Sequence, residues 1–140
     1  MPLSRRRQAL VAAIIATAGV ASIATAALLR DGDGGPPVDS RVEELIPAPD
    51  SEVLAQQAVG LDLTDSPRYV IELFLNGQRL PDGETLQATS TNRSVYQPGQ
   101  ERTVEKLRAG ENCARAVFYP LAEGPASARR GEVRWCFRAA

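Results

Sequence analysis

The segment from Arg68 to Pro81, RYVIELFLNGQRLP, limits the fold of this chain more than any other stretch. Apolar side chains recur there at every second position, the period of a β-strand with one buried face: Tyr69, Ile71, Leu73 and Leu75. Asn76-Gly77 follows directly, and a two-residue Asn-Gly turn favours a tight hairpin because both positions need a positive φ. The segment therefore predicts a strand, a hairpin turn and the start of a return strand.

Other short runs have the same strand-like character and are separated by Gly and Pro. They are Gln57–Leu63, Ser94–Gly99, Arg102–Leu107, Cys113–Tyr119 and Glu132–Ala139. About seven strands at this spacing are typical of an all-β, antiparallel sandwich, with a small closed barrel as the alternative. We expect this domain to occupy residues 46–140.

The N-terminal part has a different character. Three arginines, Arg5 to Arg7, precede an uncharged run of 21 residues from Ala9 to Leu29. A helix of that length spans about 30 Å, the thickness of a bilayer core. The pattern predicts a basic cytoplasmic tail at 1–8, a single transmembrane helix at 9–29 and an extracytoplasmic remainder, since basic flanks stay inside. A cleaved signal peptide is the alternative, with Ala24–Ala26 as the cleavage site, and it gives a secreted protein.

The stretch at 30–45 is rich in Gly, Pro and Asp at its start, which predicts a flexible linker. Beyond residue 30 the chain holds twelve basic and seventeen acidic side chains, because four of the sixteen basic residues lie before it. Nucleic acid is therefore not expected as a partner, since phosphate binding needs a basic surface.

The chain contains no histidine and only one methionine. The lack of histidine excludes Ser–His–Asp triads and histidine metal sites, and the lack of further methionines excludes thioether copper sites. We predict no cofactor, no metal and no enzymatic activity. Carboxylate pairs such as Asp62 and Asp65 leave a carboxylate-based hydrolase as an alternative, although turn formation explains those two aspartates more simply.

Two motifs carry a family resemblance. PAPDSEVLAQQAVGLDL (Pro47–Leu63) resembles the opening of bacterial Ig-like domains, and LRAGENCARAVFY (Leu107–Tyr119) resembles their late L-x-x-G-x-N turn. The region 46–140 looks like the membrane-tethered, Ig-like extracytoplasmic proteins of actinobacteria. That resemblance implies an Ig-like fold and a place in the cell envelope, but no particular activity. Copper-carrying sandwiches also look similar, but their histidine and methionine ligands are lacking here.

The only two cysteines, Cys113 and Cys136, lie in the last two predicted strands. If they face each other in a hairpin, Ala114 lies opposite Trp135 and Ala116 opposite Val133, so small core residues meet large ones. We therefore expect a structural disulfide on the outer face of that hairpin, which an exported domain would retain. A redox pair more often has C-x-x-C spacing, and a metal site would need more soft ligands.

The same register places Arg115 opposite Arg134 on the outer face. Like charges directly opposed are mildly destabilising. Either the two side chains turn toward carboxylates and water, or they form an anion- or partner-binding patch with Arg138, Arg129 and Arg130. The Pro120–Gly131 loop between the two strands is a second candidate contact surface.

Three functional classes follow from these patterns. The preferred one is a membrane-anchored module with a binding or structural role toward another envelope protein or polymer. The second is a metal-carrier or redox accessory domain, which needs free thiols. The third is the carboxylate hydrolase, which needs a pocket with two converging acids.

Overall fold

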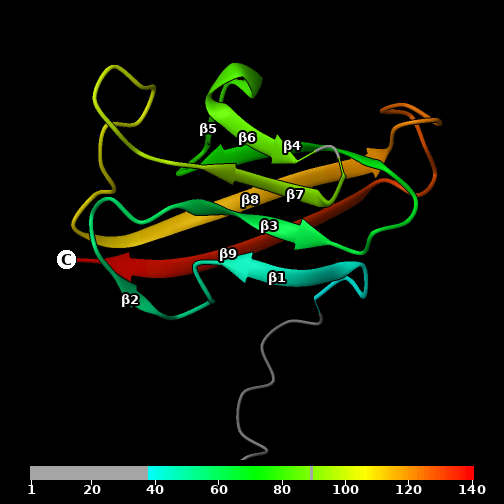
Figure 1. Ribbon diagram of the computed structural model, residues 1–140. Coiled ribbons are helices and arrows are strands. Elements are labelled where there is room, and N and C mark those ends of the chain that lie inside the picture. Colours follow the sequence, from blue (N-terminus) through cyan, green and yellow to red (C-terminus); the bar gives the residue numbers. More distant parts are fainter. Residues whose placement is uncertain (1–37, 89) are drawn as a thin grey trace, which may run out of the picture. The chain divides into compact units, whose positions relative to one another are not determined.

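The computed structural model describes residues 38–88 and 90–140, and within them the chain is all-β (Figure 1). Two sheets face each other, so the fold is a sandwich and not a closed barrel. The first sheet has the order β1 (Val42–Ile46), β3 (Val59–Leu63), β7 (Asn92–Tyr96), β6 (Thr85–Ala88). The second has the order β2 (Glu52–Val53), β9 (Gly131–Ala139), β8 (Gly110–Pro120), β4 (Tyr69–Leu75), β5 (Gln78–Arg79).

The core lies between the sheets and follows the predicted alternation. Val59, Leu61 and Leu63 of β3 are fully buried. The second sheet supplies the larger core side chains, among them Ile71, Leu73 and Leu75 of β4, Phe118 of β8, and Val133, Trp135 and Phe137 of β9. Burial of apolar surface between the sheets provides the main stabilising free energy.

The predicted hairpin at Asn76-Gly77 is confirmed. Asn76 has φ 51° and Gly77 has φ 83°, and Leu75 pairs with Gln78 across the turn. The return strand β5 is only two residues long. Pro81 follows Leu80 and cannot donate a ladder hydrogen bond, and a 3-10 turn at Asp82–Glu84 then leads the chain to the other sheet.

Four elements differ from the sequence-based expectation. Strand β2 was not predicted, and it pairs with β9 in parallel, whereas the expected sandwich was antiparallel throughout. Strand β1 begins at Val42, inside the stretch expected to be linker, and the compact unit extends from Val38 to Ala140. Strand β6 was not predicted, because it has only four residues and buries none of them fully: Leu86 and Ala88 are exposed. Arg102–Leu107 was predicted as a strand, but it is an irregular loop with bends.

The connections gather at two ends of the sandwich, which we name by the residues found there. At the Val38 end, the chain approaches β1 beside residues 64–68, 90–91 and 121–130. At the Ala140 end lie the connection from β1 to β3, the Asn76-Gly77 turn, residues 80–84 and the long loop at 97–109. Figure 1 shows the 121–130 loop and the C-terminus at opposite ends of β9.

Within the described residues no helix is long and apolar enough to cross a bilayer. The predicted tail at 1–8, the predicted transmembrane helix at 9–29 and most of the predicted linker lie outside those residues.

Candidate functional site

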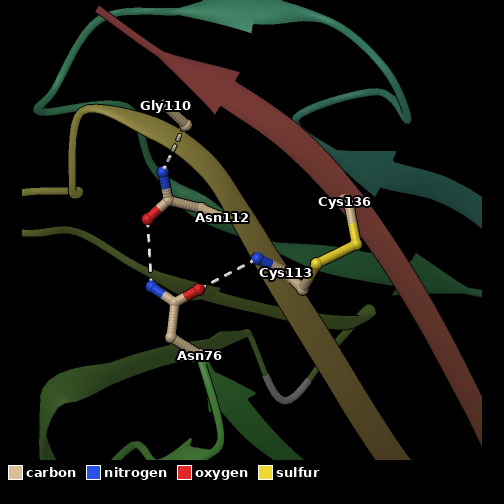
Figure 2. Close-up of a disulfide and its surroundings, with 5 residues drawn as sticks. All are labelled: Asn76, Gly110, Asn112, Cys113 and Cys136. Carbon is tan, nitrogen blue, oxygen red and sulfur yellow. Dashed lines mark hydrogen bonds between the residues drawn. A yellow bond between two sulfur atoms is a disulfide. The ribbon is translucent and has the colours of Figure 1, made fainter.

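Cys113 and Cys136 form a disulfide across β8 and β9 (Figure 2). The two residues are direct partners in the ladder, with Cα atoms 4.0 Å apart. The register predicted from the cysteines is confirmed throughout this pair of strands, since Ala114 lies opposite Trp135 and Ala116 opposite Val133. No free cysteine remains among the described residues, so the pair acts as a staple between neighbouring strands and offers no thiol for redox or metal chemistry.

A buried amide network adjoins the disulfide at the start of β8 (Figure 2). Asn112 is fully buried, and its Nδ2 donates to the carbonyl oxygens of Arg108 at 2.8 Å and Gly110 at 3.1 Å. Its Oδ1 accepts from Arg108 N and from Asn76 Nδ2. Asn76 Oδ1 in turn accepts from Cys113 N at 3.0 Å. The network therefore ties the hairpin turn, the 97–109 loop and the disulfide-bearing strand together.

This geometry gives a physical meaning to the L-x-x-G-x-N pattern. Leu107 is buried, and its N–H donates to Ala55 O at 2.8 Å, so it anchors the loop to the core. Gly110 has φ 90°, a region that favours glycine. Asn112 satisfies the backbone groups that this turn leaves unpaired. The pattern is thus a loop-closing device, and sequence reasoning noticed it without recognising that role.

The outer face of the second sheet resolves the expected conflict between Arg115 and Arg134. The two arginines are opposite each other, as predicted, and both bind the carboxylate of Glu132, at 3.2 Å from Arg115 and 2.7 Å from Arg134. The hydrogen bond from Arg134 is the main cause that lowers the pKa of Glu132, and Arg115 adds to it. Arg115 also lies over the ring of Phe74, 3.8 Å from its centroid, a cation–π contact. Arg115 is therefore held in place, whereas Arg134 remains largely exposed.

The five arginines proposed as a patch lie at three separate places. Arg115 and Arg134 share the middle of the outer face. Arg138 lies toward the Ala140 end, opposite Glu111. Arg129 and Arg130 belong to the loop at the Val38 end. Arg129 forms an ion pair with Glu123, and its hydrogen bond to that carboxylate lowers the pKa of Glu123. The structure therefore separates Arg138 from Arg129 and Arg130 by the length of β9, about 25 Å.

Sequence reasoning missed Arg41, which organises the Val38 end. Its guanidinium binds Asp39, lies 4.8 Å from the centroid of the Phe118 ring, and donates to the carbonyl oxygen of Arg129. The hydrogen bond with Arg41 also lowers the pKa of Asp39. A Cβ atom on Gly131 would lie 2.5 Å from Arg41 Nη2, so glycine at that position makes room for the arginine. Arg41 and Arg129 are 88 positions apart in the sequence, and no local sequence pattern predicts a contact between them.

Cavities open on the surface of the described sandwich, and three of them lie at different places on it. One of about 130 Å³ lies near the Val38 end, between the start of β4 and the end of β6, and is lined in part by Arg68, Thr91, Arg93 and Leu121. Another of about 390 Å³ lies at the Ala140 end beside Asn76, Lys106 and Arg108. The largest of these three, about 630 Å³, runs along the free edge of β1.

The acids of the hydrolase hypothesis do not converge in the described structure. Asp62 faces Arg93, which it contacts at 3.4 Å, and neither Asp62 nor Asp65 lines any of the three cavities. Glu43 and Glu44 both line the groove along β1, but both are exposed, and Glu44 lies 3.4 Å from Arg93. In the part of the chain that the structure describes, no group of three or more acidic, cysteine or histidine side chains could hold a metal ion.

Comparison with known proteins adds no relative. The sequence matches no protein-family model, and no match is found among curated proteins.

Proposed function

We propose that the protein is a single-pass membrane protein whose extracytoplasmic part is an Ig-like module with a binding or structural role in the cell envelope. The strand order supports the Ig-like part of this proposal. If β1 and β2 share the letter A and the later strands follow in chain order, the first sheet is A-B-E-D and the second is A′-G-F-C-C′. This arrangement is that of Ig domains. The disulfide differs, because it joins neighbouring strands of one sheet instead of bridging the two sheets.

The observation that carries the proposed location is the disulfide. Structural disulfides persist in oxidising compartments, outside the cytoplasm. An apolar run of 21 residues with Arg5, Arg6 and Arg7 before it supports export with the N-terminus inside. A compact unit with its own core begins at Val38, so the exported part needs no contribution to its core from the proposed anchor.

A module of this kind acts through its surfaces, and the proposed partner is another envelope protein or polymer. Strands β1 and β6 are the edges of the first sheet, and edge strands offer unpaired backbone groups to an extended partner. The loop at 121–130 is the other candidate surface, since exposed loops on a rigid sandwich often carry binding function.

A topology experiment on the full chain with a C-terminal epitope tag tests the proposal. After an alkaline carbonate wash, the tag is expected in the membrane pellet. The tag should be digested by protease in intact spheroplasts. The thiols of Cys113 and Cys136 should react with a thiol reagent only after reduction. A tag protected in intact spheroplasts contradicts the proposal, and a processed, soluble tag supports the secreted alternative. Replacing Arg5, Arg6 and Arg7 with glutamate is the matched control, because the positive-inside bias should then be lost and the orientation disturbed.

A further inference from the structure

The Val38 end of the sandwich is where any N-terminal tether must be attached. Arg41 binds Asp39 and the backbone of Arg129, so the chain is fastened to the 121–130 loop as it joins the fold. The carbonyl oxygen of Arg41 also accepts from Thr64 N at 2.8 Å, at the start of the 64–68 loop. Three segments distant in sequence are thereby held together at one end of the molecule.

The length of the spacer limits how far this end can lie from the proposed anchor. Leu29 is the last residue of the apolar run, and twelve residues further along the chain is Arg41. Twelve residues extend to at most about 40 Å, and a Gly-rich chain of that length averages roughly 20 Å. With the apolar run in the bilayer, the loops around Arg41 stay within reach of the headgroups.

The surface of this end has the chemistry of a membrane interface. Leu121 is 60% exposed, and it lines the 130 Å³ cavity together with Arg68, Arg93 and the hydroxyl-bearing Thr91. The exposed Arg130 lies on the same loop as Leu121, and its guanidinium has no ion-pair partner among the described residues. One guanidinium group can donate two parallel hydrogen bonds to a phosphate group. Transfer of an exposed leucine side chain from water to an apolar environment is favourable.

The two ends of the sandwich differ in charge. Among the described residues, the connecting segments at the Val38 end hold one more basic than acidic side chain: Arg41, Arg68, Arg129 and Arg130 against Asp39, Asp65 and Glu123. Those at the Ala140 end are acidic on balance: Asp50, Glu52, Asp82, Glu84, Glu101 and Glu105 against Arg102, Lys106 and Arg108. A negatively charged membrane therefore attracts the first end and repels the second.

We infer that the Val38 end docks on the headgroups of anionic phospholipids, with Arg68 and Arg130 contacting phosphate and Leu121 entering the interface. This inference rests on the proposed membrane tether. In the docked orientation, the Ala140 end faces away from the bilayer, together with the Asn76-Gly77 turn and the 390 Å³ cavity.

Hydrogen exchange of the full chain in lipid nanodiscs tests the docking. Discs of phosphatidylcholine alone are compared with discs that also contain phosphatidylglycerol. We expect the loops at 64–68 and 121–130 to exchange more slowly in the anionic discs, and the loop at 97–109 to exchange equally in both. The double variant Arg68→Gln/Arg130→Gln should lose most of the difference, because each basic residue near an anionic surface contributes about fivefold to the attraction. The matched control is Lys106→Gln/Arg108→Gln, which removes the same charge from the other end and should keep the difference.

Several results would overturn the docking while leaving the tether intact. One is a chain that inserts into both kinds of disc but shows no lipid-dependent protection at 121–130. Another is an equal loss of protection in the control variant, since net charge and not the position of the arginines would then be responsible. Protection of the same loops by soluble glycerol phosphate in phosphatidylcholine discs would identify a free phosphate ester as the ligand instead. A chain that fails to insert into either disc contradicts the proposed function itself.

Discussion

Asn76 and Asn112 join the hairpin turn to the disulfide-bearing strand through their side-chain amides. Asn76 Nδ2 donates to Asn112 Oδ1 at 3.0 Å, and Asn76 Oδ1 accepts from Cys113 N at the same distance. The asparagine of the Asn-Gly turn thus has two roles, because it adopts the positive φ of the hairpin and also fixes the turn against β8. The remaining hydrogen bonds of Asn112 close the 97–109 loop on the same strand.

Replacing Asn112 with alanine is expected to destabilise the folded domain by about 3 kcal/mol, because several buried backbone groups lose their partners. Urea unfolding of the oxidised domain measures the change, and hydrogen exchange should rise at residues 105–110. Gln100→Ala is the control, since Gln100 is exposed in the same loop and should change the stability by less than about 0.5 kcal/mol. A cost below about 1 kcal/mol for Asn112→Ala would show that the network is dispensable.

Replacing both cysteines with alanine should lower the free energy of unfolding by about 3 kcal/mol, the value for a loop of this length in the chain-entropy model. The fold should survive, because Ala114 and Ala116 still face Trp135 and Val133 in the core. Circular dichroism then shows an unchanged spectrum and urea unfolding an earlier midpoint. A domain that is unfolded without the disulfide would mean that packing alone does not hold the register.

Gly60 lies where β3 and β7 approach too closely for a side chain. A Cβ atom at this position would be 2.1 Å from Ser94 O and 2.7 Å from Val95 Cα, both of them backbone atoms that cannot turn away. We expect Gly60→Ala to cost about 3 kcal/mol or more, as in other overpacked sites. Gly83→Ala is the matched control, because nothing lies within 4 Å of its Cβ position. Equal thermal midpoints for the two variants would contradict the close approach.

The parts of the fold that the sequence predicts are those with local signals. Apolar alternation located β3 and β4, Asn76-Gly77 located the hairpin, and the cysteine pair with its neighbours gave the register of β8 and β9. Each signal depends on residues close together in the chain or on the fixed period of a strand. A single anchor of this kind was enough to align two long strands correctly.

The features that the sequence did not predict correctly depend on contacts between residues far apart in the chain. Arg102–Leu107 alternates like a strand, but the Tyr96 hydroxyl accepts from Val104 N at 2.7 Å and donates to Val104 O at 3.2 Å, which satisfies that backbone without a neighbouring strand. Strand β1 carries two adjacent glutamates and so looks like linker, yet it pairs with β3 as an edge strand. The position of Arg41 against the 121–130 loop likewise depends on the completed sandwich.

Acidification should destabilise the domain, and Glu132 should account for part of the effect. Its pKa is lowered in the fold by Arg134 and then by Arg115, so its carboxylate is more readily ionised in the folded than in the unfolded state. A group with a lowered folded pKa stabilises the fold above its ordinary pKa, near 4, and loses that contribution as the pH falls through the folded value. The pKa values of Asp39 and Glu123 are lowered by their own arginine partners and act in the same direction.

Unfolding midpoints at pH 7, 5 and 3 measure this dependence. The unfolding midpoint should change little between pH 7 and 5. It should decrease at pH values below about 4. Glu132→Gln should make the fall shallower and should slightly lower the midpoint at pH 7, because Arg115 and Arg134 then oppose each other without a shared anion. Glu43→Gln is the control, since Glu43 is exposed and forms no ion pair within the described residues. A profile for Glu132→Gln as steep as that of the control would mean that the shared carboxylate is screened by solvent and does not stabilise the outer face.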